Sequence, residues 1–89
     1  SEQMPHEIST SPGLPQPFGA SYFEGSVNFA IFSKYATDMR LCLFEYPSLS
    51  PICEVLLDPN VNKTGNVWHI LVHNLPKEIG YNYRISKTK

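Results

Sequence analysis

The aromatic side chains in the last quarter of the chain are the residues whose chemistry best suits a ligand. A flat ring can stack on the C–H face of a sugar, and a nearby amide can pair with its hydroxyl groups. Trp68, Tyr81 and Tyr83 fall on strands that we expect to be adjacent, and Asn82 lies between the tyrosines. The sequence therefore predicts a carbohydrate-binding site formed by Trp68, Tyr81, Asn82 and Tyr83.

A packing role competes with this prediction for two of the rings. Side chains alternate along a strand, so Trp68 shares one strand face with Ile70 and Val72. This pattern favours a tryptophan in the core or in an interface. We expect Tyr83 opposite Trp68 in the same hairpin, and its position also favours packing over ligand contact.

The carboxylates do not form a catalytic pattern. Hydrolysis commonly needs two or three carboxylates that converge on one bond. The acidic residues of the chain are Glu2, Glu7, Glu24, Asp38, Glu45, Glu54, Asp58 and Glu78. Most of them fall at expected strand ends and turns, where a solvated charge is the usual state. The chain has no glycine-rich phosphate loop, nucleophile elbow or cysteine–histidine signature. We predict no catalytic residue in it.

His69 and His73 have a spacing that would place both on one side of a helix. On a strand the same spacing corresponds to about 13 Å at ~3.3 Å per residue, too far for one metal ion. We therefore predict a structural role for each histidine, hydrogen-bonded or partly exposed. We predict no metal and no cofactor.

Two cysteines and one sequon are the remaining candidates for covalent chemistry. Cys42 and Cys53 lie on consecutive expected strands, so a disulfide is conceivable, although two reduced, buried thiols are the favoured interpretation. Asn62-Lys63-Thr64 matches the glycosylation sequon, which matters only in a secreted protein. We interpret the sequon as a coincidence.

Length and charge limit the possible partners. Eighty-nine residues fit one domain with a modest two-layer core. The formal net charge is −1 and the basic residues are dispersed, so we expect no nucleic-acid partner. The apolar runs are far shorter than the ~20 residues of a membrane span, and residues 1–10 lack the pattern of a secretion signal. We expect no membrane partner.

The chain divides into a leader and a β domain. Residues 1–17 contain Pro5, Pro12, Pro15 and Pro17, which fix φ and remove hydrogen-bond donors, so we predict an extended, irregular leader. Residues 18–89 form the predicted domain.

Alternating side chains predict strands at residues 22–23, 27–33, 39–45, 53–57, 67–73 and 81–85. The prolines in residues 46–51 should interrupt strand pairing. Residues 58–66 are rich in turn formers and should form an exposed loop. Short strands at this spacing predict an all-β fold, an antiparallel β-sandwich.

Several short motifs occur in a fixed order between residues 13 and 85. They are Pro17-Phe18-Gly19-Ala20, Val27-Asn28-Phe29-Ala30-Ile31-Phe32-Ser33, Ala36-Thr37, Leu41-Cys42-Leu43-Phe44, Val67-Trp68-His69, Leu75 and Tyr81-Asn82-Tyr83-Arg84-Ile85. Together they resemble the amino-terminal module of isoamylase-type glycogen and starch debranching enzymes of the α-amylase family.

This resemblance implies an immunoglobulin-like sandwich of carbohydrate-binding module family 48, placed before an α-amylase-like (β/α)8 barrel. It implies that the complete enzyme hydrolyses α-1,6 branch linkages, with carboxylates that belong to the barrel. The chain would then be a non-catalytic accessory module that packs on its own barrel and contacts an α-glucan such as glycogen, amylopectin or a maltooligosaccharide. The expected location is the cytoplasm of a bacterium or the plastid stroma of a plant.

Two other hypotheses remain. One is an autonomous glycogen- or starch-binding module that stacks sugar on exposed Trp68 or tyrosine rings. Related glycogen-binding modules use paired tryptophans with a lysine and an asparagine, whereas this chain has one tryptophan and Asn82 where the lysine is expected. That difference favours the accessory role. The other hypothesis is an immunoglobulin-like interaction domain unrelated to glucans.

Overall fold

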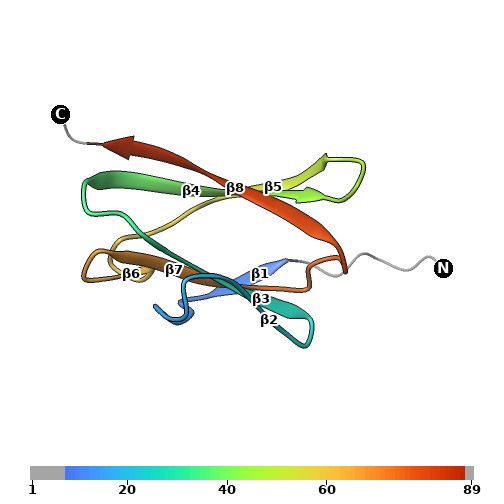
Figure 1. The fold of residues 1–89 in the computed structure, drawn as a ribbon, viewed down its shortest axis with the longest axis horizontal. Coiled ribbons are helices and arrows are strands. Elements are labelled where there is room, and N and C mark those ends of the chain that lie inside the picture. Colours follow the sequence, from blue (N-terminus) through green and yellow to red (C-terminus); the bar gives the residue numbers. More distant parts are fainter. Residues whose placement is uncertain (1–7, 88–89) are drawn as a thin grey trace.

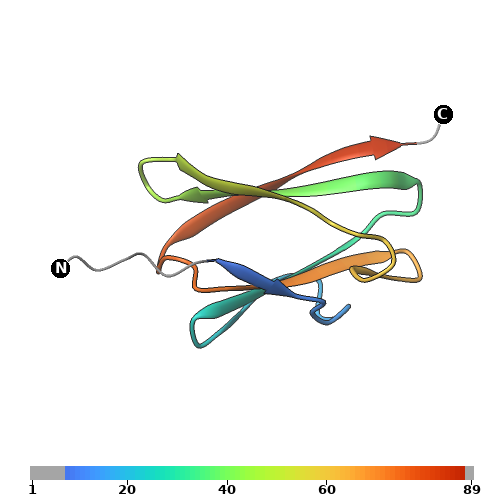
Figure 2. The same ribbon diagram turned by 180° about the vertical axis from the view of Figure 1, so that it is seen from behind.

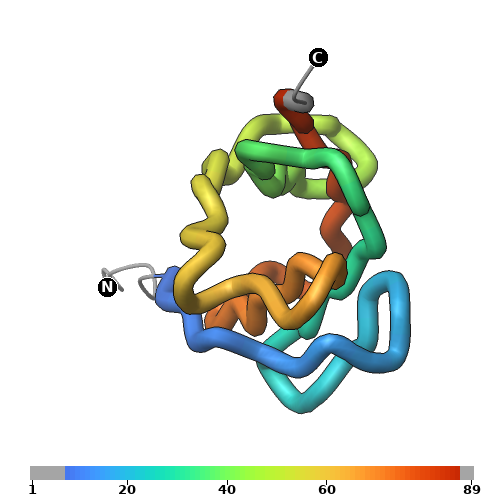
Figure 3. Tube along the Cα trace, turned by 90° about the vertical axis from the view of Figure 1, so that its left-hand side faces the viewer, coloured from blue at the N-terminus to red at the C-terminus, as the bar shows by residue number. Residues whose placement is uncertain are grey.

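Two antiparallel sheets face each other in the computed structural model, which describes residues 8–87 (Figure 1). Sheet A has the strand order β1-β7-β3-β2, with β6 also paired to β7, and sheet B has the order β5-β4-β8. The strands are β1 (Ser9–Ser11), β2 (Gly19–Phe23), β3 (Ser26–Phe32), β4 (Ala36–Glu45), β5 (Ser50–Leu56), β6 (Lys63–Thr64), β7 (Val67–His73) and β8 (Ile79–Lys87). Seen end-on in Figure 3, the sheets form two layers. The predicted all-β sandwich is confirmed.

The core lies between the sheets because one side of each central strand is apolar. Along β3 and β7 the inward side chains pair across the ladder, so that Phe29 lies opposite Ile70 and Val27 opposite Val72. Sheet B closes the core with alternating residues of β4, namely Met39, Leu41 and Leu43. No helix occurs among residues 8–87, and hence none that could cross a membrane.

The prolines between β4 and β5 interrupt strand pairing less than predicted. β5 begins at Ser50 and includes Pro51, which lies opposite Phe44. The prediction was wrong because β5 is an edge strand, where a residue without an N–H group is tolerated. A register shift between Leu43 and Phe44 marks the same place.

The expected β7–β8 hairpin does not form. β7 belongs to sheet A and β8 to sheet B, and the connection between them passes from one layer to the other (Figure 2). Trp68 and Tyr83 therefore lie on opposing sheets rather than on paired strands. The short connection suits either arrangement, and the apolar inner face of β8 favours the one that covers sheet A.

The predicted exposed loop at residues 58–66 is partly structured and partly buried. β6 lies within it and pairs with the start of β7. Asn62 is only 7% exposed, its side-chain oxygen accepts from the Asp58 N–H group at 2.9 Å, and its carbonyl accepts from the His69 N–H group at 2.8 Å. The prediction holds for residues 58–61 and 64–66, which are exposed, and fails at Asn62, where the loop satisfies its polar groups internally.

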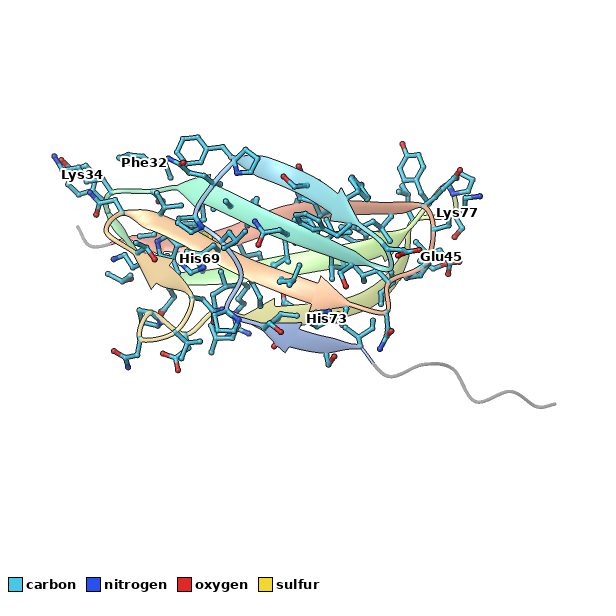
Figure 4. The ribbon with its side chains drawn as sticks, turned by 90° about the horizontal axis from the view of Figure 1, so that it is seen from below. Phe32, Lys34, Glu45, His69, His73 and Lys77 are labelled. Atoms are coloured by element: carbon cyan, nitrogen blue, oxygen red, sulfur yellow. The ribbon has the colours of Figure 1, made fainter. Side chains whose placement is uncertain are left out.

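The leader contributes a strand that the proline pattern did not predict. Ser9–Ser11 forms β1 on one edge of sheet A, whereas β2 lies on the other edge. Residues 12–18, here called the strap, join these edges and cross β7 and β3 on the outer side of the sheet (Figure 4). Residues 1–7 lie outside the described part, and the division of the chain at residue 17 stays a prediction.

Side chains of sheet A hold the strap in place. The Asn28 amide accepts from the Leu14 N–H group at 2.8 Å and donates to the Leu14 carbonyl at 3.0 Å. His69 Nδ1 donates to the Pro12 carbonyl at 2.7 Å, because a carbonyl can only accept. The Ser11 hydroxyl lies 2.7 Å from His73 Nε2. Both predicted structural histidines are thus hydrogen-bonded.

Candidate functional site

The four predicted site residues separate into two groups. Trp68 and Tyr83 lie on the inner faces of β7 and β8, and Trp68 is 1% exposed. Lys63 Nζ lies 5.0 Å from the centroid of the Trp68 ring. A buried indole has no free face for a sugar, so Trp68 is a core residue instead of a stacking platform. Tyr81 and Asn82 remain accessible, with Tyr81 39% exposed.

Tyr81 and Asn82 meet Tyr46 in a shallow pocket. This pocket has a volume of about 310 Å³ and is lined by Phe44, Tyr46, Leu49, Gly80, Tyr81 and Asn82. It lies where β4 ends and β8 begins, because Glu45 pairs with Ile79 and Phe44 with Gly80. Tyr81 pairs with the inward residue Leu43, so its ring lies on the inner face of sheet B. The Tyr46 ring and the Asn82 amide therefore line this open concavity, here called the tyrosine pocket.

Backbone and ring contacts hold both tyrosines. The Tyr46 N–H group donates to the Glu78 carbonyl at 3.1 Å, and a Cβ atom at Gly80 would lie 3.4 Å from the Tyr46 ring. The Tyr81 ring meets the buried Phe29 edge-on, with centroids 4.9 Å apart. Tyr46 nevertheless stays 55% exposed. The Tyr46 ring is thus accessible for stacking, whereas the Tyr81 ring packs against the core.

The inner tyrosine has a different environment. Burial, together with the neighbouring Tyr81 phenol, raises the pKa of Tyr83 to about 12. Among the described residues, its hydroxyl and Trp68 Nε1 are buried side-chain polar atoms without a hydrogen-bond partner. Tyr83 thus stays neutral and packs its ring in the core.

The cysteines belong to different sides of sheet B. Cys42 lies opposite Glu54 and donates to its carboxylate at 3.3 Å, whereas Cys53 lies opposite the inward residue Leu43. Neighbouring residues that face opposite sides of a sheet have poor geometry for a disulfide, and both thiols are free. Burial raises the pKa of the Cys42 thiol. Within residues 8–87, no group of three or more His, Cys, Asp or Glu residues could hold a metal ion.

Residues 17–89 match the profile of carbohydrate-binding module 48, the isoamylase N-terminal domain. The chain belongs to this family. Its curated relatives include the chloroplastic isoamylase 3 of rice (Oryza sativa subsp. japonica), which is 38% identical over 93% of this chain. The chloroplastic isoamylase SU1 of maize (Zea mays) is 47% identical over 68% of the chain. A glycogen debranching enzyme of Serratia proteamaculans is 33% identical over 84%.

The chain spans only about a tenth of the length of these relatives, between 8% and 11%. Among solved structures, a pullulanase of Paenibacillus barengoltzii matches 80% of the chain and 11% of its own length with a TM-score of 0.67. The sequence identity is 20%, so this likeness shows the fold alone.

Sequence reasoning did not include Tyr46 in the site. A weak signal was present, since Gly80 directly precedes Tyr81 and leaves space for a ring.

Asn62, the acceptor residue of the sequon, is buried and its side-chain oxygen is hydrogen-bonded. Its amide is therefore poorly accessible for glycosylation in the folded chain.

Proposed function

We propose that this chain is the non-catalytic accessory module of a glucan-debranching enzyme, and that it contacts α-glucan through the tyrosine pocket. The observation that carries the glucan contact is the convergence of the accessible Tyr46 ring, the Phe44 side chain and the Asn82 amide in one concavity. Sugar rings offer C–H faces for stacking, and their hydroxyls both donate to and accept from an amide. The tyrosine pocket supplies both kinds of contact.

The accessory role follows from what the chain contains and from the relatives it resembles. Its relatives are named isoamylases and glycogen debranching enzymes, and they are about tenfold longer. Hydrolysis of an α-1,6 linkage needs converging carboxylates, and the tyrosine pocket has no carboxylate in its lining. The remainder of such an enzyme would supply the catalytic acids. We expect the cytoplasm as the location in a bacterium and the plastid stroma in a plant.

An aromatic surface on sheet A is the candidate for packing on the catalytic domain. Tyr22 and Phe23 end the edge strand β2, Phe18 precedes it and Phe32 ends β3, and all four are more than half exposed. Phe18 and Phe32 lie at one end of β2, and Tyr22 and Phe23 lie at the other. Exposed aromatic side chains at both ends of an edge strand indicate a surface that another domain covers. This surface is separate from the lining of the tyrosine pocket.

Isothermal titration of the 89-residue chain with maltotriose tests the glucan contact. Tyr46→Ala should weaken binding about 10-fold, because it removes a stacking ring worth roughly 1.4 kcal/mol. Tyr35→Ala is the matched control, since Tyr35 is also more than half exposed but does not line the pocket. Equal affinities for the two variants would refute the tyrosine pocket as the contact site.

The alternative function is an autonomous glucan-binding module, which the exposure of Tyr46 also suits. The two functions differ in where affinity resides. An autonomous module binds maltooligosaccharide as tightly alone as within the complete enzyme, whereas an accessory module binds weakly alone. Comparing the two dissociation constants separates these hypotheses.

A further inference from the structure

We propose, on the basis of the proposed function, that the glucan site continues from the tyrosine pocket along the outer face of sheet B, and that it therefore selects long α-1,4-linked chains. A second concavity of about 350 Å³ adjoins the tyrosine pocket, and both include Phe44 and Asn82 in their lining. The two adjoining concavities together are here called the sheet B groove, which starts at Tyr46 and ends at Glu54 and Arg84.

The outer face of sheet B is the face that the chain leaves open. On sheet A the strap crosses the outer side, and Asn28 and His69 are buried beneath it. On sheet B the outward side chains of β5 and β8 are exposed, with Glu54 38% and Arg84 73% accessible. A flexible polymer can therefore lie along β4 and β8 without displacing any part of the described chain.

The chemistry changes along the sheet B groove in a way that suits a polyol. The Tyr46 end is aromatic, and Phe44 continues the apolar floor. At the far end, Arg84 Nε lies 3.4 Å from the Glu54 carboxylate, which also accepts from the Cys42 thiol. Arg40 also contacts the Glu54 carboxylate, so two guanidinium groups and one carboxylate present hydrogen-bonding groups that are oriented by their mutual pairing. This combination fits a neutral ligand that has many hydroxyls.

Chain length is the readout of this proposal. A disaccharide reaches the tyrosine pocket alone, whereas a heptasaccharide also reaches Arg84. We expect the 89-residue chain to bind maltoheptaose at least about 10-fold more tightly than maltose. Longer sugars also gain from having more possible registers on the site, so the length series alone does not decide, and variants are needed.

Arg84→Ala should weaken maltoheptaose binding about 5-fold and leave maltose binding unchanged, whereas Tyr46→Ala should weaken both. Arg40→Ala is the matched control: Arg40 also contacts Glu54, at 3.7 Å, but does not line the sheet B groove. Unchanged maltoheptaose affinity in Arg84→Ala, with intact Tyr46-dependent binding, would overturn the extended groove and spare the proposed function. Failure of the wild-type chain to bind either sugar would overturn both the extended groove and the glucan contact in the tyrosine pocket, and would leave only the accessory role.

Discussion

Tyr83 brings an apolar ring into the core but also a hydroxyl that finds no hydrogen bond there. A buried neutral hydroxyl is tolerated, whereas a buried phenolate would be strongly disfavoured. This asymmetry explains why the pKa of Tyr83 is raised to about 12, primarily by burial. The residue therefore makes folding sensitive to alkaline conditions.

We predict that the free energy of unfolding falls between pH 10 and pH 12. An unfolded tyrosine loses its proton near pH 10, whereas the folded one keeps it to about 12. The stabilisation is thus complete below pH 10 and is lost as the pH rises through this window, by an amount on the order of 2 kcal/mol. Urea unfolding at pH 9 and pH 11.5 measures the loss.

Tyr83→Phe is the control for this prediction. It keeps the ring and removes the titrating hydroxyl, so its loss of stability over the same range should be clearly smaller. It should also be no less stable than the wild-type chain at pH 8, because a buried hydroxyl without a partner contributes little. Identical pH profiles for the two proteins would contradict this account of Tyr83.

At the level of elements, the strap turns an irregular segment into part of sheet A. Gly13 makes this possible, since its φ is +78° and a Cβ atom there would lie 2.8 Å from backbone atoms of Ile70 and Leu71. Only glycine allows the strap to pass this close to β7. The Asn28 amide then pairs with Leu14 in both directions.

Gly13→Ala should lower the free energy of unfolding by more than Gly19→Ala does. Both glycines have positive φ, so each substitution costs roughly 1 kcal/mol in backbone strain. Gly19 has open space around it, whereas Gly13 also meets the sheet. We expect an additional loss of about 1–3 kcal/mol, measured by urea unfolding. Equal losses would mean that the strap is not held against β7.

The positions of the strands could be predicted from the sequence better than the contacts between segments that are far apart in it. β7 follows the predicted boundaries because residues 67–73 alternate between apolar and other side chains and are flanked by turn formers. The strap was not predictable, because its hydrogen bonds join Pro12 to His69 and Ser11 to His73, residues 57 and 62 positions apart. Local patterns carry no signal for contacts at such separations.

The candidate site shows the same limit. Tyr81 and Asn82 were predicted from residue type, and they line the tyrosine pocket. Trp68 was included for its ring, although the alternation with Ile70 and Val72 favoured the core position that it occupies. Tyr46 was left out because its partner, Gly80, belongs to a strand whose register is set only by the folded sheet.

For the molecule as a whole, the surfaces divide by chemistry. The strap covers the outer side of sheet A, the edge at β2 carries the exposed aromatic surface, and sheet B leaves its outer side open to solvent. This division suits an accessory module, which must contact a catalytic domain and a glucan without using one surface for both.

We predict that Phe23→Ser lowers the thermal unfolding midpoint of this module in the complete enzyme but hardly changes that of the 89-residue chain. Phe23 is more than half exposed here, so its loss should change the stability of the isolated chain by no more than about 0.5 kcal/mol. In the complete enzyme the same ring would be buried against the catalytic domain. Equal effects in both contexts would exclude β2 as the docking edge.

Nuclear magnetic resonance of the ¹⁵N-labelled chain, titrated with maltotriose, tests the central claim most directly. We expect the largest amide shift changes on residues 44–49 and 80–82, which line or flank the tyrosine pocket, with little change around Trp68. Changes centred on β2 or β7, or none at saturating sugar, would contradict glucan contact at this site.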